Sequence, residues 1–175
     1  MRRAPVYILA PAALAASTIV HAAALIVTKS SSVVADQVNT LNPKMIPGAT
    51  LDYAMRVENP NGVLSGVTVG AVVIEDPLPA TVALRVTDYG AAGSGPVEFA
   101  DGVLLGLLGS GLGFSYAGLS SRSDGVEFFD GTSWAYTPVP DAQGYDAKVR
   151  GVRVRLTGTL AAGSAFRLRF RVRLK

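Results

Sequence analysis

The sequence contains no cysteine and only one histidine, His21, among its 175 residues. The absence of cysteine excludes disulfides, thiol catalysis and any cysteine metal site. His21 lies in a segment that we expect to be removed, which would leave no imidazole for a catalytic triad or a metal site. We therefore expect a protein that is not an enzyme and that holds no cofactor and no metal ion.

Two acidic pairs are the remaining candidates for acid–base catalysis, Glu75 with Asp76 and Asp141 with Asp146. Adjacent strand residues point to opposite faces, so Glu75 and Asp76 cannot share a site without a turn. The dipeptide Asp76-Pro77 is typical of turn initiation. Residues 141–146 place acids around a glycine, but they lack the ligand pattern of an EF-hand and are interpreted as an acidic loop.

Long apolar runs are also scarce. The one long run, from Val6 to Val20, follows the basic start Met1-Arg2-Arg3 and precedes the small residues Ala22 to Ala24. This order is typical of a secretory signal peptide, and we expect residues 1–23 to be cleaved between Ala22 and Ala24. No later segment is long enough for a membrane helix. The sequence thus predicts a secreted protein whose mature domain is 24–175.

Charge is distributed unevenly along the expected domain. Residues 148–175 contain nine Lys or Arg and no acid, whereas all thirteen Asp and Glu residues precede them. The two charges can pair within one molecule, or the basic end of one subunit can be steered toward the acidic surface of another. Nucleic acid is not an expected partner, because the aromatic residues are not interleaved with the basic ones.

Apolar and basic side chains alternate without exception from Phe166 to Lys175. Because successive side chains of a strand point to opposite faces, this pattern predicts a strand with one apolar and one basic face. The basic face is either an ordinary solvated surface or a cationic docking face. Its candidate residues are Arg167, Arg169, Arg171 and Arg173.

The rest of the domain consists of short β-rich runs separated by Gly, Pro, Asn and Asp, without helical periodicity. Turns are expected at Asn59-Pro60-Asn61-Gly62, where Asn-Gly tolerates positive φ, and at Asp130-Gly131. The fold class is therefore all-β. We expect strands at Leu25–Ser31, Thr50–Glu58, Val67–Ile74, Val82–Asp88, Gly113–Ala117, Val126–Phe129, Trp134–Thr137, Val149–Leu156 and Ala165–Leu174, with Val103–Leu108 left open as a strand, a short helix or a flap.

Three motifs occur in order: Asn42-Pro43-Lys44-Met45-Ile46-Pro47-Gly48, then Thr50-Leu51-Asp52-Tyr53-Ala54-Met55-Arg56-Val57-Glu58-Asn59, then Val73-Ile74-Glu75-Asp76-Pro77-Leu78-Pro79. Their order resembles the conserved-repeat domain of bacterial surface proteins. The resemblance covers essentially the whole domain, from Leu25-Ile26-Val27-Thr28-Lys29 to the final alternating strand. It implies a single immunoglobulin-like antiparallel β-sandwich with a structural or adhesive role outside a bacterial cell. The chain departs from the family in having one copy and a glycine-rich insertion around 90–145.

The segment Ala24 to Val34 contains apolar β-formers ahead of the Pro47-Gly48 turn. It can serve as an ordinary first strand, or it can leave its own sheet and complete that of a neighbour. The leading hypothesis is a structural subunit of a bacterial extracellular or cell-surface filament or matrix, which assembles head to tail from copies of itself. The candidate self-association residues are Leu25, Ile26, Val27, Val33 and Val34.

The alternative hypothesis is a monomeric adhesin or carbohydrate-binding module that binds a surface polysaccharide. Trp134-Ala135-Tyr136 places two aromatic rings on one face of an expected strand, and Tyr145 follows nearby. Such rings can stack on sugars, although a sandwich core requires aromatic residues as well. The candidate stacking residues are Trp134, Tyr136 and Tyr145.

Overall fold

The computed structural model describes residues 23–102 and 109–175. In this part of the chain the fold is all-β, with one short 3-10 turn, η1 (Val63–Ser65). No helix of the described residues is long and apolar enough to cross a bilayer. The expected signal peptide falls almost entirely on residues outside this range, as does the segment Val103–Leu108. The strands are β1 (Ile26–Ala35), β2 (Thr50–Glu58), β3 (Val69–Gly70), β4 (Val73–Pro77), β5 (Val82–Arg85), β6 (Val97–Asp101), β7 (Leu112–Gly113), β8 (Val126–Phe129), β9 (Tyr145–Asp146), β10 (Gly151–Arg155), β11 (Thr157–Leu160) and β12 (Ala165–Leu174).

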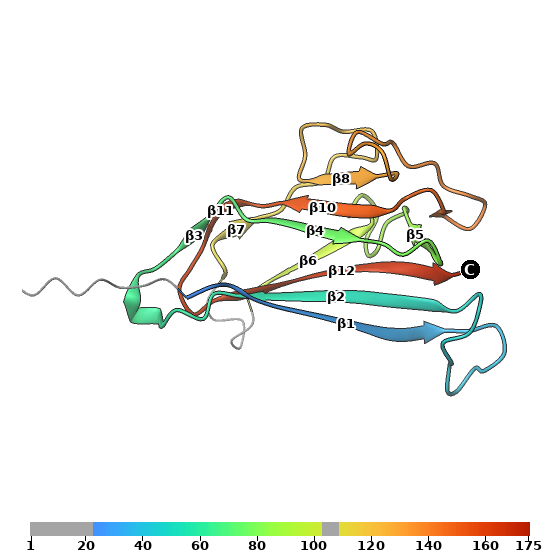
Figure 1. Ribbon diagram of the computed structural model, residues 1–175, viewed down its shortest axis with the longest axis horizontal. Helices are drawn as coiled ribbons and strands as arrows, with labels where there is room; N and C mark the ends of the chain where they lie inside the picture. The colour runs from blue at the N-terminus through green and yellow to red at the C-terminus, as the bar shows by residue number, and fades with distance from the viewer. Residues whose placement is uncertain (1–22, 103–108) are drawn as a thin grey trace, which may run out of the picture.

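The alternating segment forms β12, the central strand of the main sheet (Figure 1). Along one edge β12 pairs antiparallel with β2 over nine residue pairs, and along the other edge it pairs first with β6 and then with β5. The sheet continues from β2 to β1 and from β5 to β9. As the alternation predicts, Phe166, Leu168, Phe170 and Val172 are fully buried, and the arginines lie on the opposite face.

A second layer covers the apolar face of the main sheet. It consists of β4, β10 and β8, and it continues beyond Leu156 as β3, β11 and β7. Apolar residues from both layers form one buried cluster, which supplies the driving force for their packing. Its largest fully buried members are Phe128, Phe166, Phe170, Leu51, Leu84, Leu160 and Leu168. The arrangement is sandwich-like, with strands running along the long axis of the molecule (Figure 1).

Three expected strands have the observed bounds, namely Thr50–Glu58, Val126–Phe129 and Ala165–Leu174. The expected strand Val67–Ile74 is divided into β3 and β4 by Ala71, whose φ is 51°. Asp76-Pro77 lies in β4 rather than in a turn. The prediction of a strand at Trp134–Thr137 was wrong, because this segment makes isolated bridges only, among them Phe128 to Tyr136. The remaining expected strands are present with shifted or shorter bounds, and β6, β9 and β11 were not predicted.

The Asn59 segment differs from the expected Asn-Gly turn, because Gly62 has a negative φ of −56°. Asn59 is instead a buried hydrogen-bonding centre. Its Nδ2 donates to the carbonyl oxygens of Val67 and Leu160, and its Oδ1 accepts from the backbone and side chain of Asn61. The side chain therefore ties β2, β11 and the chain after η1 together. At the second expected turn, Asp130 accepts hydrogen bonds from the backbone N–H groups of Thr132 and Ser133.

Residues 90–145, which the resemblance sets apart as an insertion, contribute strands to both layers. They supply β6 to the main sheet and β8 to the second layer. The core uses Val97 from β6 and Phe128 from β8. This region is therefore a structural part of the domain and not an appendage.

Candidate interaction surfaces

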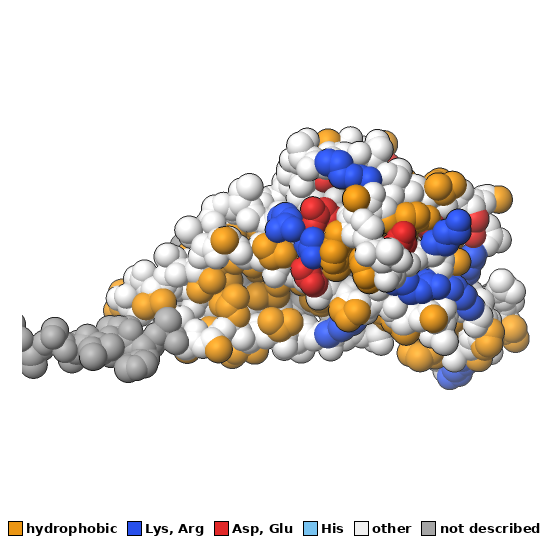
Figure 2. All heavy atoms as spheres, turned by 45° about the horizontal axis from the view of Figure 1, so that its top comes forward, with side chains coloured by type: hydrophobic (Ala, Val, Ile, Leu, Met, Phe, Trp, Pro, Cys, Tyr) orange, Lys and Arg blue, Asp and Glu red, His pale blue; other side chains and the backbone are white. Residues whose placement is uncertain are grey.

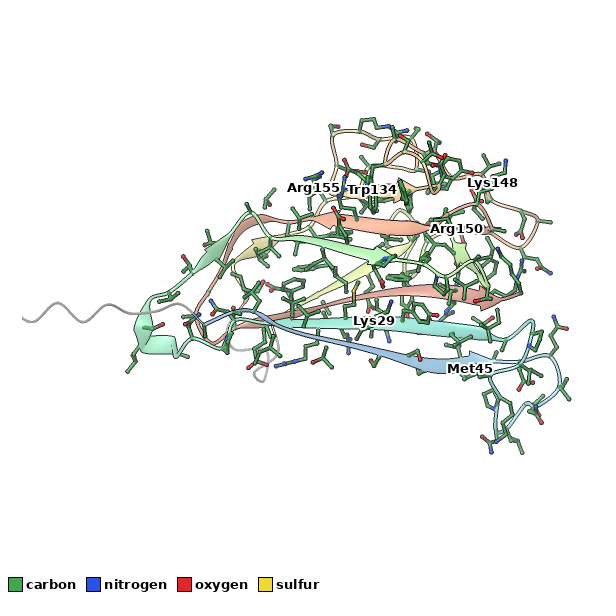
Figure 3. All side chains as sticks on the ribbon, in the orientation of Figure 1. Lys29, Met45, Trp134, Lys148, Arg150 and Arg155 are labelled. Atoms are coloured by element: carbon green, nitrogen blue, oxygen red, sulfur yellow. The ribbon has the colours of Figure 1, made fainter. Side chains whose placement is uncertain are left out.

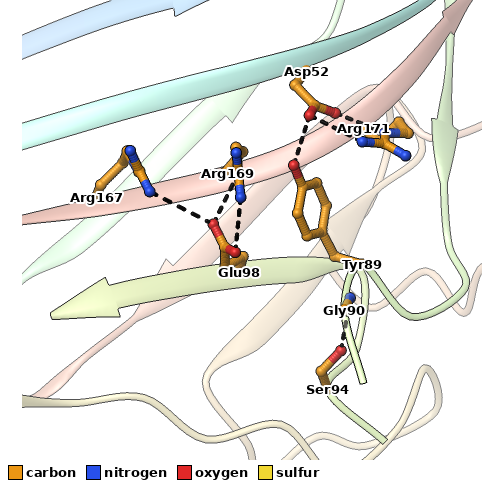
Figure 4. Close-up of polar contacts among 8 residues, drawn as sticks. All are labelled: Asp52, Tyr89, Gly90, Ser94, Glu98, Arg167, Arg169 and Arg171. Carbon is orange, nitrogen blue, oxygen red and sulfur yellow. Dashed lines mark hydrogen bonds and ion pairs between the residues drawn. The ribbon is translucent and has the colours of Figure 1, made fainter. Parts of the chain in front are cut away.

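The arginines of β12 lie in a row on the outward face of the main sheet, and acidic side chains accompany them (Figure 4). Arg169 donates two hydrogen bonds of 2.9 Å to the carboxylate of Glu98 on β6. Arg171 donates two, of 2.7 and 3.0 Å, to Asp52 on β2. Arg173 donates one of 2.9 Å to Asp141. Arg167 lies 4.0 Å from Glu98 and is the most exposed of the four.

Tyr89 packs against this row and connects it to β2. The guanidinium carbons of Arg169 and Arg171 lie 4.8 and 5.2 Å from the centre of its ring. Its hydroxyl donates a 2.6 Å hydrogen bond to Oδ2 of Asp52. Burial, together with the neighbouring Asp52 carboxylate, raises the pKa of Tyr89 to about 12.

Asp52 thus receives donors from both Arg171 and Tyr89. Burial alone raises the pKa of this carboxyl, but the hydrogen bonds from Arg171 and Tyr89 outweigh burial and hold the pKa below its ordinary value. The contrast in charge along the sequence is therefore largely compensated within the molecule at this face. The candidate docking face of Arg167, Arg169, Arg171 and Arg173 presents paired arginines, and a partner has to compete with these pairs.

On the outer face of the second layer, arginines are likewise paired with acidic side chains. On β10, Arg153 contacts Glu75 of β4 at 2.7 Å and Glu127 of β8 at 2.8 Å, and Arg155 contacts Glu127 at 3.2 Å. Figure 2 shows acidic and basic side chains side by side on this face, with a largely apolar and uncharged surface toward the narrow end. Glu75 points outward while Asp76 is buried, as their adjacent strand positions predict.

β1, which contains four of the five candidate self-association residues, is the edge strand of the main sheet. It pairs with β2 from Ile26 opposite Glu58 to Ala35 opposite Thr50, and its other edge has no partner among the described strands. None of its residues is buried. Ile26, Val27 and Val34 are exposed, whereas Val33 is half-buried and packs against the core. Leu25, just before the strand, also packs against the core.

One ion pair ties β1 to the second layer. Nζ of Lys29 lies 2.5 Å from Oδ1 of Asp76 and 4.9 Å from the centre of the Tyr53 ring. The Asp76 side chain is 4% exposed, and its second oxygen has no hydrogen-bond partner among the described residues. Lys29 therefore provides the charge that compensates a buried carboxylate.

The three candidate stacking residues do not form one platform. The Trp134 ring stacks on Phe129 at 5.0 Å, lies 3.9 Å from the guanidinium carbon of Arg153, and lies against Gly151 on the outer face of β8 and β10 (Figure 3). Tyr136 packs against the core, and its hydroxyl donates to buried Asp146 at 2.8 Å. Tyr145 is on β9 of the main sheet, and its ring lies under the guanidinium of Arg173. Each ring has a different neighbourhood.

Sequence reasoning missed a cleft of about 440 Å³ at the start of β6. Its lining combines a glycine-rich loop with three half-buried aromatic rings. The residues are Gly90, Ala91, Gly93, Ser94, Val97, Glu98, Phe99, Phe114 and Tyr116. The available signal was the combination of closely spaced glycines, which permit close approach, with aromatic residues on either side.

The large exposed apolar residues belong to segments that lie toward the two ends of the elongated molecule (Figure 1). At the narrow end, where β1 begins, these are Ile26, Val27, Val63, Leu64 and Val73. At the wide end, where β1 leads into β2, they are Val34, Val38, Leu41, Met45 and Val139. Leu64 and Leu41 are almost fully exposed, at 101% and 98%.

No protein-family model matches this sequence, and comparisons with curated proteins and with solved structures find no significant similarity.

Proposed function

We propose that the protein is a structural subunit of a bacterial extracellular or cell-surface filament or matrix. In this proposal copies join head to tail, and β1 of one copy completes the main sheet of the next. The sequence supports the extracellular setting through the apolar run that follows Met1-Arg2-Arg3. The motif order from Asn42 to Pro79 supports an immunoglobulin-like surface module.

The observation that carries the proposal is the position of β1. It is an edge strand of ten residues, none of them buried, so its main contributions are backbone pairing with β2, the packing of Val33 and the Lys29 to Asp76 ion pair. A terminal strand of this kind can be exchanged at small net cost, because an identical strand from a neighbour restores the same hydrogen bonds. The Lys29 to Asp76 contact would re-form in the same way.

The connection between β1 and β2 is long enough for exchange. It contains the fourteen residues 36–49, which when extended reach about 46 Å. β1 itself is about 33 Å long. A connection of this length allows β1 to leave its own sheet and to pair antiparallel with β2 of a neighbouring copy.

The apolar ends favour the same arrangement. A contact between the narrow end of one copy and the wide end of another is heterologous, and such contacts produce open filaments when rotation does not close a ring. Burial of Leu64 and Leu41 at this junction would remove apolar surface from water. The two ends thus provide a second contact that is independent of the exchanged strand.

The proposal is tested by electron microscopy and light scattering of the mature domain, with and without residues 24–34. The deletion variant also carries Asp76→Asn, so that no uncompensated carboxylate remains in the core. Filaments from the intact domain and monomers from the folded deletion variant support the proposal. Monomers from both at every concentration contradict it.

A second pair of variants keeps the test valid if the deletion unfolds the domain. Leu64→Ser and Leu41→Ser alter fully exposed side chains, so we expect folding to be unaffected and filaments to be shorter or absent. Unchanged filament length in the double variant would contradict the head-to-tail contact.

A further inference from the structure

The cleft at the start of β6 has the size and lining of a small-molecule site. Its volume of about 440 Å³ lies in the range of ligand pockets in proteins. One wall is the loop Gly90–Ser94, which follows Tyr89 directly (Figure 4). The other walls are formed by β6 and by the chain after β7.

Aromatic rings form the apolar part of the cleft. Phe99 and Phe114 are nearly parallel, with an interplanar angle of 16° and 5.8 Å between ring centres. The Tyr116 ring lies so close to Gly95 that a Cβ at that position would be 2.5 Å from it. Glycine at 95 is therefore what allows the loop to lie against the Tyr116 ring.

The polar part of the cleft is fixed before any ligand arrives. Asp88 accepts hydrogen bonds from the N–H groups of Gly93 and Gly95, and the Ser94 hydroxyl accepts one from Gly90. Glu98 is held by two hydrogen bonds from Arg169. Because these contacts hold the loop and the carboxylate in place, little ordering remains to oppose binding.

The charge of the lining identifies the ligand class. Glu98 is paired with Arg169, so the wall carries no net charge and offers no free counter-ion to an ionic ligand. What remains is an apolar lining of Phe99, Phe114 and Tyr116 next to a hydroxyl and a carboxylate that can accept hydrogen bonds. A sugar ring has one face of C–H groups and an edge of hydroxyls, and it complements both parts. We propose that this cleft binds a neutral saccharide.

The proposal is independent of strand exchange, since neither β1 nor the two apolar ends line the cleft. For an assembled subunit it would add a contact to neutral polysaccharide along the side of the filament. The proposal assigns sugar binding to this cleft and not to Trp134, whose ring lies on the outer face of the second layer.

The test is a titration of the mature domain with neutral disaccharides of glucose, galactose and N-acetylglucosamine. Two-dimensional amide NMR spectra are recorded at each step. We expect shifts confined to residues 88–99 and 114–116. Ala91→Trp fills the cleft from an exposed position, and Tyr116→Ala removes a ring. Each should weaken binding about tenfold or more, the equivalent of one aromatic contact. Trp134→Ala is the matched control and should leave binding unchanged.

Three results would overturn the proposal: no shifts with any of the sugars at millimolar concentration, binding that persists in Ala91→Trp, or binding that is lost in Trp134→Ala. Since Ala91 is exposed, Ala91→Trp is expected to fold even if Tyr116→Ala does not. The outcome does not depend on whether filaments form.

Discussion

Arg171 and Asp52 lie opposite each other on β12 and β2, and their side chains form a two-point hydrogen-bonded ion pair 119 residues apart in the sequence. The pair lies on the outward face, where Tyr89 adds a third hydrogen bond. It links β12 and β2 through side chains as well as through the backbone.

Asp52→Asn should destabilise the domain by about 2 kcal/mol near neutral pH, because it removes hydrogen bonds to a charged acceptor. The folded pKa of Asp52 is below its ordinary value, so this stability is present above the unfolded pKa and is lost as pH falls through the folded pKa. Urea unfolding at about pH 7 and about pH 3 measures the difference, which should shrink at the lower pH. A difference that grows toward acid pH would contradict the assignment.

Tyr89 provides the corresponding test at alkaline pH. Its pKa is raised to about 12, so the folded state resists ionisation. Its contribution to stability is complete below the unfolded pKa of about 10 and is lost as pH rises through the folded value. In an ultraviolet absorbance titration, Tyr89→Phe should remove one late-ionising tyrosine. Loss of an early-ionising one instead would show that the hydroxyl is free.

Lys29→Met should cost about 3 kcal/mol, because it leaves Asp76 as a buried carboxylate without its cation. Adding Asp76→Asn should recover part of this loss, since no buried charge then remains. Lys44→Met, at an exposed lysine, is the control and should change stability by no more than about 0.5 kcal/mol. Chemical denaturation of the wild type, Lys29→Met, Asp76→Asn and the double variant gives the coupling free energy, and additive effects would mean that the two side chains do not interact.

Two glycines with left-handed backbone distinguish the cost of backbone strain alone from the cost of strain combined with a steric clash. Gly66 has a φ of 66° and open space around it, whereas Gly158 has a φ of 80° and a Cβ there would lie 2.3 Å from the carbonyl oxygen of Gly111. Gly66→Ala should cost about 1 kcal/mol. Gly158→Ala should cost clearly more, because β7 and β11 must move apart. Thermal unfolding of both variants measures this, and equal losses would contradict the close approach of these strands.

Local patterns predicted the strands whose two faces differ most. The alternation from Phe166 to Leu174 and the core-facing Leu51, Met55 and Val57 of β2 were sufficient to define those strands. β6 was missed because its sequence lies in a glycine-rich region and its pairing partner, β12, is far along the chain. Trp134 was misplaced because its contact surface exists only where Gly151 leaves room beside β8.

In the candidate docking face, too, only the features that depend on local pattern could be predicted. The sequence predicted that the arginines share one face, since this depends only on strand period. It could not predict that Glu98, Asp52 and Asp141 come from three different segments to pair with them, because this depends on the order of strands in the sheet. The closely spaced glycines of Gly90–Ser94 were a local signal, but the convergence of this loop with Phe114 and Tyr116 depends on the order of strands in the fold.

Engineered disulfides test strand exchange most directly, because the chain has no cysteine of its own. Ser30 and Ala54 are opposite each other in the β1 to β2 ladder, a separation that suits a disulfide. Ser30→Cys and Ala54→Cys proteins are purified separately, mixed at filament-forming concentration and oxidised. Exchange predicts a covalent heterodimer on a non-reducing gel, whereas Ser120→Cys mixed with Ala54→Cys should give none. If the mixture yields no heterodimer while the Ser30→Cys/Ala54→Cys double variant closes its disulfide within single chains, β1 stays in its own sheet and the account is contradicted.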